Sequence, residues 1–96
     1  MKNLPKWRTP PYLRLHWQSW EDESVVYNSR SGSTHLLDLV AAETLKILEK
    51  QSATLPELVD LVASSFKIEP NAELSRHLEK LLLELEKLEL LEMVQQ

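Results

Sequence analysis

The chain has 96 residues, of which 43% are hydrophobic, and this length suits one domain with a modest core. It contains no cysteine, which excludes a disulfide framework and thiolate chemistry, and no apolar run approaches the ~20 residues of a membrane span. We therefore expect a cytoplasmic protein without a membrane partner.

Charge is distributed unevenly along the chain. Residues 1–37 carry five Lys or Arg against three Asp or Glu, residues 38–96 carry six against twelve, and the net charge is −4. A nucleic-acid binder gains affinity when a basic face releases counterions. The acidic second part therefore argues against a nucleic-acid partner.

The first eleven residues are expected to form a flexible tail ahead of a single domain at residues 12–96. Pro5, Pro10 and Pro11 disfavour a helix and suit an extended segment. Trp7 lies in this basic stretch, and we expect it to be disordered, the alternative being that the tail folds onto a partner enzyme.

A first strand is expected in "YLRLHWQSW", residues 12–20, where apolar and polar residues alternate. Leu13, Leu15 and Trp17 fall on one face, which we expect to be buried. Trp20 falls on the other face, near the turn, and we expect it to be exposed.

A hairpin is expected next. "VVYN" at 25–28 and "STHLL" at 33–37 are rich in β-forming residues, and "SRSG" between them ends in Gly32, the only glycine. Glycine takes positive φ without steric cost, so a tight turn is expected here.

Three helices are expected after the strands. Asp38 is a plausible N-cap for a helix to about Lys50, Thr54 and Glu57 form a capping box, and Asn71 caps the third helix. The apolar positions expected to be buried are Ala41, Leu45 and Leu48 in the first helix, Leu58, Val59, Val62 and Phe66 in the second, and Leu74, Leu78, Leu81, Leu85 and Leu88 in the third.

Leu82 and Leu83 lie outside the leucine stripe of the third helix, one on each of its two flanks. One flank combines basic residues with a leucine, in the order Arg76, Lys80, Leu83 and Lys87, which suits a groove for an acidic and apolar peptide. The alternative is an isolated exposed leucine among lysines that balance the nearby glutamates. The sequence does not decide where this helix ends, because residues 89–96 fit a helical continuation and an extended tail alike.

The order of elements predicts an α+β fold with a three-stranded antiparallel sheet followed by three α-helices. The segments that carry a family resemblance are "VVYNSRSGSTHLLD", "AAETLKILE", "TLPELVDLVASSF" and "LEKLLLELEKLELLE". They resemble the PqqD-like family, small peptide-binding modules also called RiPP recognition elements. These modules serve enzymes that modify ribosomally made peptides. The pattern "W.DE.VVYN..SG.THLLD" is most similar to the PqqD-family peptide chaperones of the HPr-related (HPr-rel-A) system.

The resemblance covers about residues 12–92 and rests on small and apolar residues rather than on a catalytic signature. One departure is Glu89, where many relatives have glycine.

The resemblance implies a winged-helix-like fold and a mechanism. A precursor or leader peptide would add a strand to the sheet, in the groove between the third strand and the third helix, and be presented to a modifying enzyme. The peptide-binding residues would be Ser33, Thr34, His35, Leu36 and Leu37 on the strand and Arg76, Lys80, Leu83 and Lys87 on the helix. Backbone bonds would go to Thr34 and Leu36, or to His35 and Leu37, depending on register.

Other candidate sites carry weaker signals. His16, His35 and His77 lack the spacing of metal ligands, so neither a metal nor another cofactor is expected. The carboxylates of Glu21, Asp22 and Glu23 are expected in a solvated turn rather than in a catalytic pair.

We therefore expect a non-catalytic protein that is a monomer or a weak dimer. Two alternatives stay open. One is a winged-helix DNA-binding protein with residues 72–88 as recognition helix. The other is a structural homo-oligomer that pairs through the leucine stripe or the sheet edge.

Overall fold

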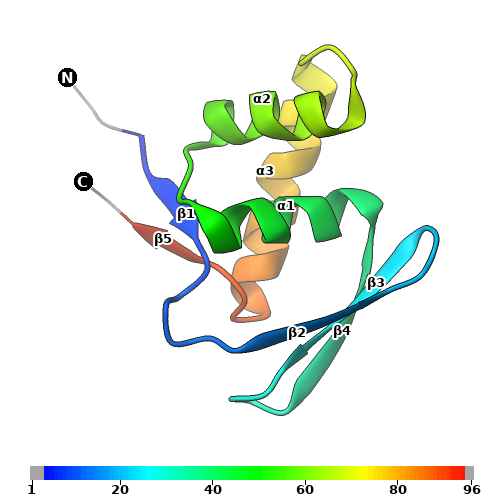
Figure 1. The fold of residues 1–96 in the computed structure, drawn as a ribbon. Coiled ribbons are helices and arrows are strands. Elements are labelled where there is room, and N and C mark those ends of the chain that lie inside the picture. Colours follow the sequence, from blue (N-terminus) through cyan, green and yellow to red (C-terminus); the bar gives the residue numbers. More distant parts are fainter. Residues whose placement is uncertain (1–3, 95–96) are drawn as a thin grey trace.

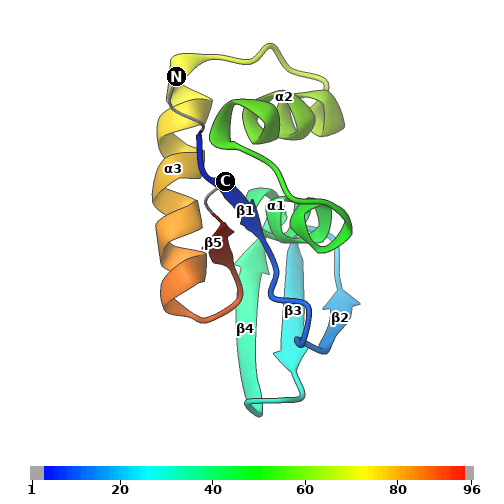
Figure 2. The same cartoon turned by 90° about the vertical axis from the view of Figure 1, so that its left-hand side faces the viewer.

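The computed structural model describes residues 4–94 of the chain. Three helices lie above a three-stranded sheet, and a two-stranded ribbon lies on one side of the helices (Figure 1, Figure 2). The elements in chain order are β1 (Lys6–Arg8), β2 (Leu15–Ser19), β3 (Glu23–Asn28), β4 (Ser33–Asp38), α1 (Leu39–Lys50), α2 (Leu55–Phe66), α3 (Ala72–Lys87) and β5 (Glu92–Val94).

The larger sheet is antiparallel, in the order β2-β3-β4, and three helices follow it, which confirms the predicted α+β fold. Its register pairs Trp17 with Val26 and Val26 with His35. The hairpin between β3 and β4 closes as expected. Gly32 has a φ of +79°, and its N–H donates to the Asn28 carbonyl at 2.8 Å.

The core lies between the sheet and the helices. α1 packs on β3 and β4 and against α2, and α2 packs against α3. Val26 and Leu37 enter the core from the sheet, and Leu15 and Trp17 pack against it as predicted. The helix positions predicted to be buried are buried or partly buried, apart from one: Ala41, Leu45, Leu48, Leu58, Val59, Val62, Phe66, Leu74, Leu78, Leu81 and Leu85.

One prediction about the leucines of α3 is wrong, and one leucine outside the predicted stripe is also buried. Leu88 is 41% exposed, because the helix ends at Lys87 and the chain then turns; Leu90 and Leu91 are buried in its place. Leu82 is only 1% exposed although it lies outside the predicted stripe. It is buried because Trp7, from the N-terminal segment, packs on that side of the helix.

The N-terminal segment differs from the expected flexible tail. Residues 1–3 of that tail lie outside the described residues, but Lys6–Arg8 form strand β1, which pairs antiparallel with β5. Trp7 is only 8% exposed and belongs to the core. The second edge of β1 is held by Ala53: the Trp7 N–H donates to the Ala53 carbonyl at 2.7 Å, and the Ala53 N–H donates back at 3.0 Å.

The predicted helix caps are confirmed. Asp38 accepts from the Ala41 N–H at 2.8 Å, and Asn71 accepts from the Leu74 N–H at 2.8 Å. Thr54 and Glu57 form the reciprocal capping box. The backbone hydrogen bond from Thr54 lowers the pKa of the Glu57 carboxyl, and the Thr54 hydroxyl and the charge of Lys6 act in the same direction.

The end of α3 is fixed by a left-handed residue. Glu89 has a φ of +64°, its N–H donates to the Glu86 carbonyl at 2.9 Å, and the Leu90 N–H donates to the Leu85 carbonyl at 3.0 Å. This pair of bonds is a Schellman motif, in which the left-handed residue is usually glycine. The chain then continues into β5, so residues 92–94 are extended and not helical.

Replacing Glu89 with glycine should raise the free energy of unfolding by up to about 1 kcal/mol, because glycine adopts positive φ without the steric cost that a side chain incurs there. Urea unfolding followed by circular dichroism measures the change.

The control is Arg76→Gly, at an exposed position inside the same helix, which should lower stability by about 1 kcal/mol. A Glu89→Gly protein destabilised as much as this control would show that the helix does not end where the structure places it.

Candidate functional site

The edge of the larger sheet is formed by β4, which pairs only with β3 within the described residues. Figure 2 shows that β4 is the strand of this sheet nearest to α3. An edge strand presents main-chain N–H and C=O groups that another extended chain can pair with. Which residues of β4 present them depends on the direction of the hydrogen bonds in the sheet.

Those directions follow from the two ends of the β2–β3 ladder. The Trp20 N–H donates to the Glu23 carbonyl at 2.8 Å, and the Ser29 N–H donates to the Arg14 carbonyl at 3.0 Å. Because main-chain groups of successive residues point to opposite sides of a strand, the odd-numbered residues from 23 to 29 face β2. The residues that face β4 are therefore Ser24, Val26 and Asn28, and the bond from Gly32 to Asn28 agrees with this.

The partners of these three β3 residues in β4 are Leu37, His35 and Ser33. Their main-chain groups are engaged within the sheet, so those of Thr34 and Leu36 point to the open edge. The outward-pointing main-chain groups of the described β4 strand are therefore those of Thr34 and Leu36.

The side chains of β4 divide between the two faces of the sheet. Leu37 is buried, and half-buried His35 lies with its Nε2 3.2 Å from the Ser33 Oγ. Thr34 is exposed, and Leu36, which is 63% exposed, is on the face away from α1. The strand thus has one face of buried or half-buried side chains and one face of exposed side chains.

Two hollows lie between the ends of β4 and α3. The one at the end of β4, with a volume of about 210 Å³, is lined by Asp38, His77, Lys80, Leu81 and Glu84. The one at its start, of about 370 Å³, is lined by Ser33, His35 and residues of the hairpin, together with Leu88 and Glu89. The end of β4 therefore lies near the middle of α3, and the start of β4 lies near the end of α3. The helix thus runs antiparallel to the strand.

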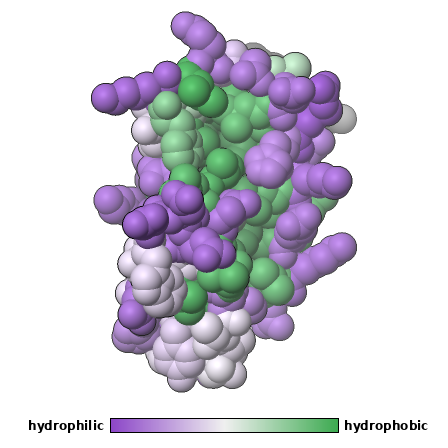
Figure 3. Space-filling view, turned by 90° about the vertical axis from the view of Figure 1, so that its right-hand side faces the viewer, coloured by the Kyte–Doolittle hydropathy of each residue, from purple (hydrophilic) through white to green (hydrophobic). Residues whose placement is uncertain are grey.

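Apolar surface is also exposed where β4 passes into α1. Leu36 and Leu39, on either side of Asp38, are 63% and 47% exposed. Figure 3 shows the face that includes this junction, with a band of apolar surface between hydrophilic side chains. A chain lying along the edge would therefore meet apolar as well as polar surface.

Of the four α3 residues expected to form the wall beside β4, only Lys80 lines a hollow there. Arg76 and Lys87 are exposed, and Leu83 lines a different pocket, next to Trp7. The cause is helical geometry: at 100° per residue, the predicted flank points directly away from the buried Leu78 and Leu85.

The side of α3 that faces the ends of β4 carries His77, Leu81, Glu84 and Leu88, which sequence reasoning did not assign to the site. His77 was considered as a metal ligand, and Leu81 and Leu88 were expected to be core residues. These positions could have been found as one edge of the leucine stripe. The residues near them in the sequence, however, do not indicate which edge of the stripe faces the sheet.

The charges beside the edge are mixed. Lys80 shares its hollow with the carboxylates of Asp38 and Glu84. In the other hollow the Arg30 guanidinium lies over the Tyr12 ring, 5.5 Å from its centre, and Glu89 adds a carboxylate. The site therefore offers both signs, rather than the basic wall that was expected.

Within residues 4–94, no group of three or more His, Cys, Asp or Glu residues could hold a metal ion, and none of the helices has the length and hydrophobicity that spanning a bilayer requires. Glu21, Asp22 and Glu23 are exposed in and beside the turn after β2, and Trp20 is 56% exposed, as predicted.

Comparison with known proteins gives the family. The family model described as "Coenzyme PQQ synthesis protein D (PqqD)" matches residues 23–91. The chain belongs to the PqqD family. The matched part of this PqqD-family chain begins at β3 and contains the β4 edge and the whole of α3, whereas β1, β2 and β5 lie outside it.

A solved structure has the same fold. It is described as "TbiB1 in Complex with the TbiA(beta) Leader Peptide", and it matches with a TM-score of 0.66 and 24% sequence identity over 88% of this PqqD-family chain and 94% of that one. No curated protein matches the chain.

Proposed function

We propose that this PqqD-family chain is a non-catalytic peptide-binding module. It binds an extended precursor or leader peptide as a fourth strand on β4 and presents it to a modifying enzyme. The observation that carries the proposal is the β4 edge, where Thr34 and Leu36 direct main-chain groups outward. In such strand addition, main-chain bonds supply affinity and neighbouring side-chain pockets supply selectivity.

The solved complex supports the kind of ligand. TbiB1, which shares the fold, is in complex with a leader peptide. For this chain we assign the backbone contacts to Thr34 and Leu36 and keep Ser33, His35 and Leu37 as the residues that hold the strand. On the helix, the hollows favour Lys80, His77 and Leu88 as contacts over Arg76, Leu83 and Lys87.

We further propose that the chain is a peptide chaperone of the HPr-related (HPr-rel-A) system. The support is the sequence pattern at residues 20–38, with its tryptophan, acidic turn and hairpin. The test is genomic: genes for a short precursor and for the other proteins of that system should lie beside its gene.

Removing a single main-chain N–H tests the binding mode. Leu36→Pro deletes a donor that faces the open edge, and proline is tolerated on edge strands when its missing N–H faces solvent. We expect the fold to persist and peptide affinity to fall at least about tenfold, because a bond from the strand to the peptide is lost. Leu36→Ala keeps the N–H and controls for the side chain.

His35→Pro is the matched counterpart, since it removes an N–H that faces β3. It should destabilise the domain more than Leu36→Pro does, because it breaks a bond within the sheet.

The probes are synthetic 12-residue peptides that tile the short proteins encoded beside the gene. Calorimetric titration should find a binder with a dissociation constant near micromolar, about −8 kcal/mol, since ordering a flexible peptide offsets much of the contact energy. A complete absence of binders, or a binder indifferent to Leu36→Pro, would contradict the proposal.

A further inference from the structure

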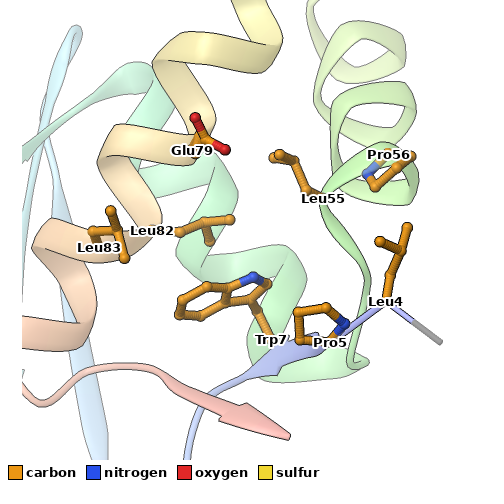
Figure 4. Close-up of a pocket in the computed structure, with 8 residues that line it drawn as sticks. All are labelled: Leu4, Pro5, Trp7, Leu55, Pro56, Glu79, Leu82 and Leu83. Atoms are coloured by element: carbon orange, nitrogen blue, oxygen red, sulfur yellow. The ribbon is translucent and has the colours of Figure 1, made fainter. Parts of the chain in front are cut away.

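A second hollow surface lies on the far side of α3 from β4. It is a pocket of about 330 Å³ between β1, the start of α2 and the middle of α3. Figure 4 shows Trp7 and Leu82 at its base, with Leu55 and Pro56 on one side and Glu79 and Leu83 on the other. Nothing in the peptide site on β4 uses these residues.

The lining is almost wholly apolar and partly open to solvent. Leu82 and Trp7 are buried, but Leu83 is 49% exposed and Leu4, at the mouth, is 55% exposed. A hollow of this size lies at the small end of ligand pockets and suits one large apolar side chain. Burial of these exposed side chains by a partner would add to the hydrophobic stabilisation of the complex.

The polar groups of the pocket define the occupant further. Glu79 is the only charged residue among the described residues that line it, and Glu86 continues the same flank of α3. Glu79 makes no ion pair within residues 4–94, where the one such pair joins Arg8 and Glu92. The carboxylate is therefore available to a cation at the rim.

Trp7 supplies a donor as well. No hydrogen bond joins its indole N–H to residues 4–94, although this nitrogen is not a buried atom left without a partner. Figure 4 shows the ring nitrogen on the side of the ring toward Leu82 and Leu55. A main-chain carbonyl next to the apolar side chain of an occupant would satisfy it.

We propose that this pocket is a docking site for a partner protein, and that it takes a large apolar side chain with a Lys or Arg beside it. Leu83 and Glu79 lie on the opposite shoulder of α3 from Leu81 and Glu84. A partner docked here therefore leaves the β4 edge free, so that the chain binds two protein segments at once.

Three synthetic peptides test this chemistry: acetyl-AKFKA-amide, its glutamate counterpart acetyl-AEFEA-amide, and acetyl-AKAKA-amide without the aromatic anchor. Each is titrated into the ¹⁵N-labelled full chain, and the Trp7 indole signal is followed by NMR. Trp17→Phe and Trp20→Phe assign that signal by elimination. We expect the lysine peptide to shift it, the glutamate peptide to bind about fivefold more weakly, and the alanine peptide to leave it unchanged.

Matched variants separate the contributions. Glu79→Gln should abolish most of the preference for the lysine peptide, and Leu83→Asp, at an exposed position, should remove binding while the fold persists. Lys80→Gln, on the β4 side of the helix, should change neither.

Equal binding of the lysine and glutamate peptides, no shift of Trp7, or shifts confined to residues 33–37 would overturn the proposal. Leu36→Pro should not alter these titrations, so this proposal and the peptide site on β4 succeed or fail separately.

Discussion

Replacing Trp7 with alanine should lower the free energy of unfolding by about 3–5 kcal/mol, the usual cost of removing a buried aromatic side chain. Trp7 is 8% exposed, sits in the core cluster and covers Leu82. Since a small domain has a total stability of only about 5–15 kcal/mol, the variant should lose a large part of it.

Urea unfolding followed by far-ultraviolet circular dichroism measures the loss without depending on tryptophan fluorescence. Trp20→Ala is the control, because Trp20 is 56% exposed and its removal should change stability by about 0.5 kcal/mol or less. Equal, small effects of the two substitutions would mean that the N-terminal segment is the unattached tail that its prolines suggest.

Replacing Leu85 with alanine should cost roughly 2–5 kcal/mol. Leu85 is 1% exposed at the centre of the buried face of α3, and its carbonyl accepts the Leu90 N–H that ends the helix. The truncated side chain would leave a cavity that the surrounding leucines fill only in part.

The control is Leu83→Ala, two residues away on the same helix, where the side chain is 49% exposed. It should change the unfolding midpoint only slightly, because little apolar surface returns to water. If Leu83→Ala proved the more damaging of the two, the assigned rotation of α3 would be wrong.

The buried side chains replaced in these stability tests are not among the proposed peptide contacts. The stability tests are therefore independent of the β4 site. Leu85 and Trp7 test the fold, whereas Leu36→Pro tests one outward-facing donor and Glu79→Gln one carboxylate. A result that affects binding without affecting unfolding therefore identifies a surface rather than a packing effect.

Elements that depend on residues close together in the chain were predictable without the tertiary structure. Asp38, Thr54 and Asn71 cap helices by bonds to residues three positions away, and Gly32 closes a turn within five residues. Such signals are complete within a few residues, so they could be interpreted without knowledge of the rest of the fold. The β4 strand was likewise indicated by its β-forming residues after a glycine turn, whereas its role as an open edge was implied only by the family resemblance.

Tertiary structure alone decided what depends on distant residues. β1 pairs Arg8 with Glu92, and three-residue strands carry too little pattern to be recognised from either end. That pairing places Trp7 on α3, so Leu82 is buried and Leu83 becomes part of a pocket.

The wall beside β4 was decided in the same way. Helical spacing shows which residues of α3 share a flank, but the packing of α3 against α2 and of Trp7 against Leu82 determines which flank faces the sheet. The physical reason is that a helix buries its apolar stripe equally well with either shoulder toward a neighbouring sheet, and only contacts made far away in the sequence remove that freedom.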